Sequence, residues 1–236
     1  MSKIVHPYAH RLIILRDWKS HWFADPKQYC DFLKRDVLIR EYLEKKLRAM
    51  YVSSIEIERN QKTTRFIIRT SRPGLIIGRN GEGVTKLKED ILKKISKLKL
   101  AKPEDFKLEI VEVGNPEADA SIVAYMIAEG LEKRMPYRRV IKQIVEKVMM
   151  AHGVEGVRVV LGGRLGGAEI ARTEELKRGS IPLQTFRADI DFKREKAHLP
   201  YGDVGIKVWI YRGKIFADKK PLKVSAKGGF ASGEKN

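Results

Sequence analysis

The chain has 236 residues, enough for one large or two ordinary domains, and 43% of them are hydrophobic, so a packed core is possible. The chain is strongly basic, because it has 48 Lys and Arg but only 30 Asp and Glu, which gives a formal net charge of +18. Each cation near a phosphate displaces condensed counterions, so this excess predicts a nucleic-acid partner.

Several classes of site are excluded by the residue inventory. Cys30 is the only cysteine, so no intrachain disulfide can form, and the five histidines are too scattered for Cys/His metal spacing. They are His6, His10, His21, His152 and His198. The apolar run at residues 12–15 is too short for a signal sequence or a membrane span. We expect a cytoplasmic protein with no metal, cofactor, membrane partner or small-molecule substrate.

The first residues predict an arm and then a helix. Residues 1–16, interrupted by Pro7, have no clear period, and residues 17–29 concentrate two tryptophans and a phenylalanine, which we interpret as a local aromatic plug. Residues 27–49 are predicted to be helical, since their apolar residues recur mostly every three or four positions. These are Tyr29, Phe32, Leu33, Leu38, Tyr42, Leu43 and Leu47.

The pattern then changes to strands and back. Residues 51–60 and 63–71 predict two strands joined at residues 60–62, followed by an apolar turn at 75–77. Val84, Leu87, Ile91, Ile95 and Leu98 predict a further helix, and residues 106–113 alternate as a third strand. The order is α-β-β-α-α-β.

A second α+β unit is predicted after a hinge at residues 114–119, where Gly, Asn and Pro follow one another. Two helices, 117–134 and 137–151, are followed by four short strands, which predicts two helices on a mainly antiparallel sheet. The strands are residues 157–161, 168–176, 185–192 and 204–213. We therefore expect an arm at 1–16, domains at 17–114 and 115–216, and a flexible basic tail at 217–236.

A glycine-rich loop at residues 74–87 has two nucleotide-binding interpretations that fail. Val84 stands where a P-loop needs lysine, and Asn80 stands where a dinucleotide fingerprint needs glycine. Gly78-Arg79-Asn80-Gly81 instead fits the G-x-x-G clamp of K-homology domains, which lets RNA backbone approach protein backbone. The alternative is a plain turn between two helices.

Two other stretches are candidates for contact. A second glycine-rich turn holds Gly166 and Gly167 with Arg164 and Arg172 nearby, and it either supplies positive φ or contacts RNA or a neighbouring protein. On a helical wheel, residues 137–151 place the three cations Arg138, Arg139 and Lys142 opposite the apolar face. Periodicity alone favours a solvated basic face there, with Glu146 and Lys142 able to pair.

Long stretches of the chain resemble the bacterial S-three family of small-subunit ribosomal proteins. They include "RPGLIIGRNGEGV", "RMPYRRVIKQ", "GRLGGAEIART", "PLQTFRADIDF" and "YGDVGIKVWIYRG", and the match covers nearly the whole chain. The resemblance implies a type II K-homology domain at about 39–114. The clamp pair Arg79-Asn80 departs from the family, where two cations are common.

The resemblance also implies a function. It implies a structural protein in the head of the small subunit that contacts small-subunit ribosomal RNA and neighbouring proteins, with S-ten and S-fourteen expected. It implies that Arg138, Arg139 and Lys142 line the channel by which messenger RNA enters and passively help to unwind it.

Two other classes compete with this one. A free K-homology regulator would bind RNA away from ribosomes. An enzyme would need a carboxylate cluster, and Asp189 with Asp191 is a conceivable pair for two metals. Arg187 and Lys193 share that strand face, so cross-strand charge pairing on a solvated sheet is favoured, and we predict no enzyme.

Overall fold

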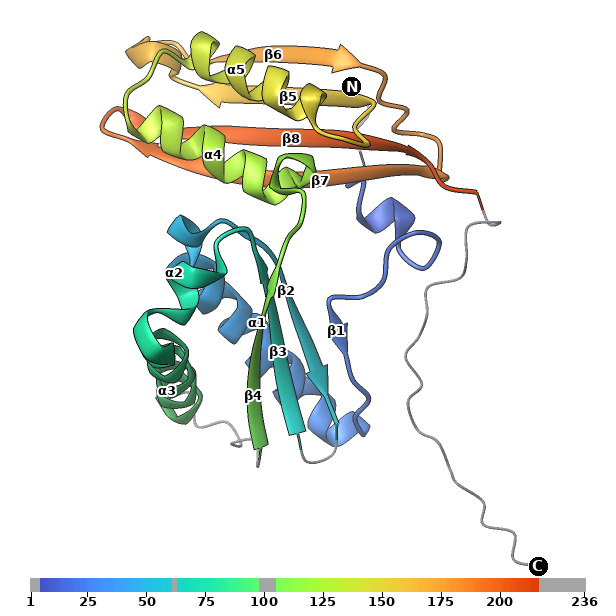
Figure 1. Cartoon of the computed structure of the whole chain (residues 1–236), viewed down its shortest axis with the longest axis vertical. Helices are drawn as coiled ribbons and strands as arrows, with labels where there is room; N and C mark the ends of the chain where they lie inside the picture. Colours follow the sequence, from blue (N-terminus) through green and yellow to red (C-terminus); the bar gives the residue numbers. More distant parts are fainter. Residues whose placement is uncertain (1–4, 61–62, 98–104, 217–236) are drawn as a thin grey trace, which may run out of the picture.

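Two four-stranded sheets lie one above the other and carry all the long helices (Figure 1). The computed structural model describes residues 5–60, 63–97 and 105–216. The predicted connection at 61–62, the helical residue Leu98 and the tail at 217–236 lie outside the described residues.

The first sheet has the order β1-β2-β3-β4. Its strands are β1 (Ser20–His21), β2 (Val52–Arg59), β3 (Thr63–Thr70) and β4 (Asp105–Glu112). Its helices are α1 (Pro26–Lys46), α2 (Pro73–Ile77) and α3 (Glu82–Lys97). From α1 to β4 the predicted α-β-β-α-α-β order is confirmed. The sequence did not predict β1, which is parallel to β2, because two residues are too few to show alternation.

The core of this domain follows the predicted periods only in part. Alternate strand residues such as Ile57 and Ile68 are fully buried, and α3 buries Leu87, Ile91 and Ile95 as its spacing predicted. The predicted helix is confirmed as α1, but the apolar residues Tyr29 and Leu33 in its first half are exposed.

The buried residues in that half of α1 are the charged Arg35 and Asp36. Asp36 and Arg59 form a buried ion pair, and the Arg59 guanidinium lies 4.3 Å from the Phe32 ring centroid. Trp22 packs against Tyr29 and Phe32 with ring centroids 5.2 and 6.0 Å away. The aromatic plug is therefore confirmed for Trp22, whereas Trp18 and Phe23 are 53% and 93% exposed.

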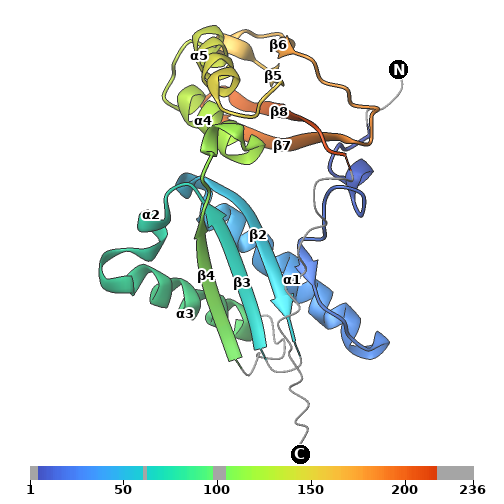
Figure 2. The same ribbon diagram turned by 45° about the vertical axis from the view of Figure 1, so that its right-hand side comes forward.

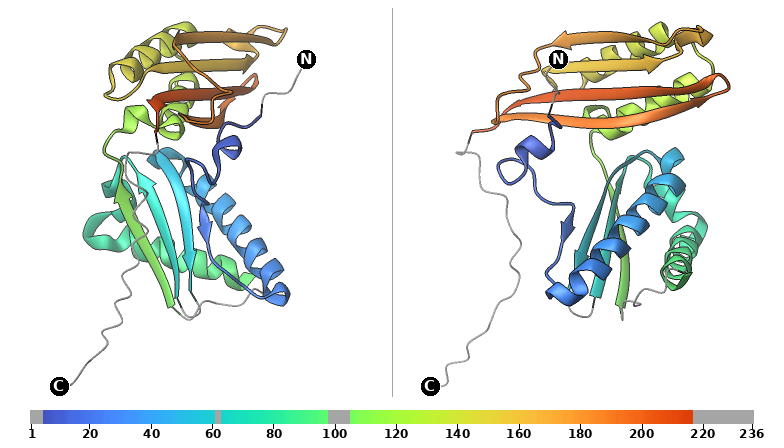
Figure 3. Two further views of the ribbon diagram at one scale, coloured as in Figure 1. Left: turned by 90° about the vertical axis from the view of Figure 1, so that its right-hand side faces the viewer. Right: turned by 180° about the vertical axis from the view of Figure 1, so that it is seen from behind.

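The second sheet is antiparallel throughout, with the order β6-β5-β8-β7. Its strands are β5 (Gly156–Gly163), β6 (Arg172–Gly179), β7 (Ala188–Leu199) and β8 (Gly202–Lys214). Helices α4 (Ala120–Glu132) and α5 (Tyr137–Met150) cover one face, and the view from behind in Figure 3 shows the other. Two helices on an antiparallel four-stranded sheet are thus confirmed.

Two strands, β6 and β7, differ most from the prediction. β6 begins at Arg172 rather than at residue 168, because a 3₁₀ turn at Leu165–Gly167 and an irregular stretch come first. β7 begins at Ala188 and runs on to Leu199, seven residues past the predicted end at 192. The residues directly after Phe192 are charged, so the sequence pattern did not predict that the strand continues.

The domains are connected twice (Figure 2). The predicted hinge ends in Asp119, whose carboxylate caps α4 by accepting hydrogen bonds from the Ser121 and Ile122 amides over 2.8 and 3.3 Å. The N-terminal arm is the second connection, since it runs from β7 to β1 of the first sheet. Arg11 anchors it, and this side chain is fully buried.

Candidate nucleic-acid interface

The G-x-x-G loop joins α2 to α3 through three residues with positive φ. Gly78, Asn80 and Gly81 have φ of 70°, 51° and 79°, which glycine and asparagine tolerate better than other residues. A Cβ on Gly83 would lie 2.3 Å from the Ile76 carbonyl oxygen, so α3 begins directly against the end of α2. The bend is therefore fixed by the sequence at each of these positions.

The tip of this loop is open to a ligand. Arg79 and Asn80 are exposed, and within the described chain neither side chain has a hydrogen-bond or ion-pair partner. The apolar side chains of Leu75 and Ile77 beside it are 55% and 39% exposed. The first amides of α3 add a partial positive charge, while Glu82 in that first turn opposes an anion and pairs with Lys86 at 3.3 Å.

Helix α5 divides cleanly into two faces. Val140, Ile141, Val145 and Val148 are buried against the second sheet and α4. Arg138, Arg139 and Lys142 are exposed on the other side, and we call these three residues the α5 cation face. Among the described residues, Arg139 and Lys142 have no hydrogen-bond or ion-pair partner for their side chains.

Arg138 differs from the other two because Glu174 of β6 holds it. Its Nη2 and Nε lie 3.1 and 3.4 Å from the Glu174 carboxylate, which also accepts a 2.8 Å hydrogen bond from the Tyr137 hydroxyl. Hydrogen bonds from Arg138 and then Tyr137 lower the pKa of Glu174. The pKa of Arg138 is raised in turn, chiefly by its hydrogen bond to Glu174.

The pairing suggested for Glu146 and Lys142 is wrong. Glu146 instead lies 3.5 Å from Arg178 of β6, because α5 packs across that strand. Lys142 consequently keeps its charge free for an external partner.

The second glycine-rich turn abuts the start of α5. Gly166 and Gly167 both have positive φ, and a Cβ on Gly166 would lie 3.8 Å from Cε1 of Tyr137. Arg164 donates to the carbonyl oxygens of Ala168 and Tyr201 over 2.9 and 3.1 Å. Arg172 is exposed and lies 3.4 Å from the Tyr137 hydroxyl. Two predicted sites, the glycine turn and the α5 cation face, thus meet around Tyr137 and Glu174.

Sequence reasoning missed Tyr137 and Glu174. Glu174 follows an arginine and a threonine in a polar stretch, and only the pairing of Leu161 with Glu174 in the β5–β6 register shows which residues it opposes. Strand alternation places Glu174 on one of the two faces of the sheet, but it does not show that α5 covers that face. The G-x-x-G loop belongs to the other domain, away from this cluster (Figure 1).

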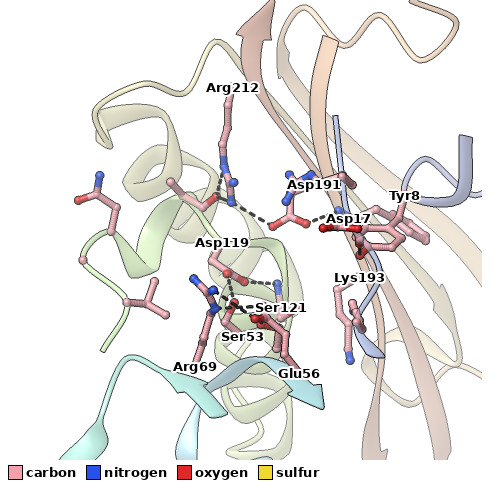
Figure 4. A pocket seen from close by; sticks show the side chains of 18 of the residues that line it. Tyr8, Asp17, Ser53, Glu56, Arg69, Asp119, Ser121, Asp191, Lys193 and Arg212 are labelled. Atoms are coloured by element: carbon pink, nitrogen blue, oxygen red, sulfur yellow. Dashed lines mark hydrogen bonds and ion pairs between the residues drawn. The ribbon is translucent and has the colours of Figure 1, made fainter. Parts of the chain in front are cut away.

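A cleft of about 1250 Å³ separates the two sheets, and its charged groups largely satisfy one another (Figure 4). Ser53 of β2 donates to Asp119, while Arg69 and Glu56 pair at 3.0 Å. Arg212 of β8 lies 3.1 Å from Asp191. Of these three contacts, only the Ser53–Asp119 bond joins the two domains, whereas the other two pair charges within one sheet each.

Asp189 and Asp191 each form ion pairs as predicted, but with arginines of the arm and of β8, and the face on which they lie is not solvated. Asp189 binds Arg16 of the arm at 2.6 Å, and Asp191 accepts from the Ala120 amide as well as from Arg212. Both carboxylates are only 15% exposed, so the predicted solvated face is wrong: α4 and the arm cover it. In the described part of the chain no group of His, Cys, Asp and Glu is arranged to hold a metal ion.

Comparison with known proteins identifies the family. Residues 38–118 match the KH domain model, and residues 127–210 match that of the ribosomal protein S3 C-terminal domain. The small ribosomal subunit protein uS3 of Clostridium novyi is 42% identical over 220 residues, which cover 93% of this chain and 96% of that protein. Its Pseudomonas paraeruginosa counterpart is 43% identical over 93% of each chain. The chain belongs to the uS3 family.

Family membership confirms the resemblance found in the sequence. uS3 proteins are RNA-binding ribosomal proteins of translation, and the family is not one of enzymes. No helix among the described residues has the length and apolar character needed to cross a membrane. None of these comparisons tests the role of a particular residue or the exact domain limits, which stay predictions.

Proposed function

We propose that this protein is a structural component of the small-subunit head, where it binds small-subunit ribosomal RNA and lines the channel by which messenger RNA enters. The names of its relatives and its charge of +18 support this assignment. Within the cytoplasmic ribosome its neighbours would include S-ten and S-fourteen.

The α5 cation face is the observation that carries the messenger role. Three cations project from two turns of a helix whose opposite face is locked in the core, so their spacing is set by the fold. Arg139 and Lys142 are exposed and, in the described structure, unpaired. Such a surface binds the phosphates of a single strand without selecting a sequence.

Passive unwinding follows from that property. A surface that holds single-stranded phosphates stabilises the open form of a fraying hairpin, so the strands re-pair less often. The chain then needs no nucleotide-binding site, in keeping with the missing lysine at Val84.

The G-x-x-G loop is proposed as a second RNA contact. Exposed Arg79, the amides at the start of α3 and the apolar pair Leu75 and Ile77 together suit a short stretch of RNA backbone with unstacked bases. Arg164, Arg172, Gly166 and Gly167 are proposed to support the surface beside α5 or to contact RNA or a protein neighbour.

Sedimentation of the tagged full chain from lysate tests the assignment against a free K-homology regulator. We expect the protein to co-migrate with the small subunit at both magnesium concentrations. At ordinary magnesium the small subunit is part of whole ribosomes, and at low magnesium the ribosome dissociates into its subunits. Protein that stays at the top of the gradient, bound to other RNA, would instead support the free regulator.

A further inference from the structure

Glu174 is fixed in place beside the α5 cation face. Its side chain is 27% exposed, and its backbone position is set by the β5–β6 ladder. The Tyr137 hydroxyl and the Arg138 guanidinium donate to it from α5, and Arg172 Nε lies 4.0 Å away on its own strand. The carboxylate therefore occupies the centre of a group of donors.

This placement divides the three cations into two kinds. Arg138 is 71% exposed, yet two of its N–H groups already point at a carboxylate. A phosphodiester would use the same pair of N–H groups, because guanidinium binds carboxylate and phosphate in the same forked geometry. Arg139 and Lys142 face no such competitor among the described residues.

We propose that Glu174 is a built-in competitor for RNA phosphate at Arg138 and thereby sets how tightly the α5 cation face holds a strand. The inference rests on the function proposed above for that face. A strand that must move past three unopposed cations would be held more tightly and released more slowly. Glu174 keeps one of the three contacts exchangeable.

Both members of the pair stay charged near neutral pH. The lowered pKa of Glu174 and the raised pKa of Arg138 mean that protonation does not break the contact there. Removal of the competitor therefore requires either displacement by phosphate or mutation.

Glu174→Gln tests the proposal, and Glu175→Gln is the matched control. Glutamine keeps the size of the side chain and can still accept from Tyr137, so the fold is preserved. Glu175 is the next residue of β6 but points to the other face of the sheet, where it pairs with Arg158 at 2.6 Å. The two variants change net charge equally. Affinity of the full chain for a short fluorescent oligouridine is measured by anisotropy over a range of salt concentrations.

We expect Glu174→Gln to tighten binding by about two- to fivefold, the range that an exposed ion pair of ordinary strength allows. The dependence on salt becomes steeper, because one more phosphate is neutralised. Glu175→Gln gives a smaller gain. In an Arg138→Ala background, Glu174→Gln gives no more gain than Glu175→Gln does, since the contact it releases is missing.

Equal gains from the two glutamine variants, or an excess gain of Glu174→Gln over Glu175→Gln that persists without Arg138, would overturn the proposal, because the release of Arg138 would then not explain binding. The double variant Arg139→Ala, Lys142→Ala separates this failure from failure of the proposed function. If it binds oligouridine as tightly as the unmodified chain, the α5 cation face is not an RNA contact, and both ideas fall. If it binds more weakly, only the role of Glu174 is lost.

Discussion

Arg11 and Ala188 are 177 residues apart, and the Arg11 Nε donates a 2.6 Å hydrogen bond to the Ala188 carbonyl oxygen. The other guanidinium nitrogens donate to carbonyl oxygens of Pro7, Pro182, Leu183 and Thr185. The buried charge thus faces a ring of carbonyl dipoles. Through this contact the N-terminal arm is held against the start of β7, an edge strand of the second sheet.

Arg11→Lys is expected to destabilise the fold by about 3 kcal/mol, because an ammonium has too few donors for these carbonyls and leaves buried acceptors unpaired. Urea unfolding of the full chain measures the loss. Arg16→Lys is the matched control in the same arm, since its partner Asp189 is a single carboxylate that lysine can also reach. Equal losses from both changes would contradict the anchoring role of Arg11.

Asp119 is expected to make the stability depend on pH. Burial, and then the charge of Asp191, raise the pKa of its carboxyl group. A raised folded pKa means that the protonated form favours folding, so this contribution is full below the unfolded pKa of about 3.9 and is lost as pH rises through the folded value. Asp119→Asn keeps a capping residue and does not titrate.

The unfolding free energy of Asp119→Asn should therefore rise relative to that of the unmodified chain as pH increases from about 4 towards neutral. Denaturant melts of both proteins across this range give the difference. If the unmodified chain gains on the variant over the same range, the hydrogen bonds from Ser53, Ser121 and Ile122 outweigh burial and the sign is wrong.

Arg164→Ala is expected to lower the unfolding free energy by about 1–2 kcal/mol, because two backbone carbonyls lose their donor. Arg172→Ala serves as the comparison, since that side chain is exposed and makes only long contacts, 3.4 Å to the Tyr137 hydroxyl and 4.0 Å to the Glu174 carboxylate. Unchanged melting of Arg164→Ala, with reduced incorporation into small subunits, would restore the RNA or protein contact as its main role.

The double variant Arg79→Asp, Asn80→Asp is expected to weaken RNA binding by the G-x-x-G loop without lowering the melting temperature. Asp tolerates the φ of 51° at position 80, whereas side chains at Gly78 and Gly81 would strain the loop. Binding of a short single-stranded RNA measures the effect, with Arg79→Gln, which keeps Asn80, as the uncharged control. Equal affinity of the aspartate variant and the unmodified chain would mean that the loop does not hold RNA.

Local pattern was sufficient for much of the fold. Regular spacing predicted α3 and both helices of the second domain, and G-x-x-G between two helices predicted the position of the loop. Where charged residues enter the core, periodicity misled us: the Asp36–Arg59 pair makes the first half of α1 face differently from its apolar pattern.

The candidate site shows the same limit. The helical wheel of α5 correctly predicted that Arg138, Arg139 and Lys142 are exposed, because this prediction needs only the spacing of residues along one helix. The partners of Arg138 and Glu146 come from β6, and sheet register is a long-range property that one sequence does not reveal. Glu174 was therefore missed and Glu146 was given the wrong partner.

The most direct test of this account measures translation rates with small subunits that carry Arg138→Ala, Arg139→Ala and Lys142→Ala together. These exposed side chains contribute nothing to the core, so the fold and subunit assembly are expected to stay intact. We predict slower passage through a message with a stable hairpin and an unchanged rate on an unstructured message. Equal rates for variant and unmodified subunits on the hairpin message would contradict the account and leave α5 with an ordinary solvated basic face.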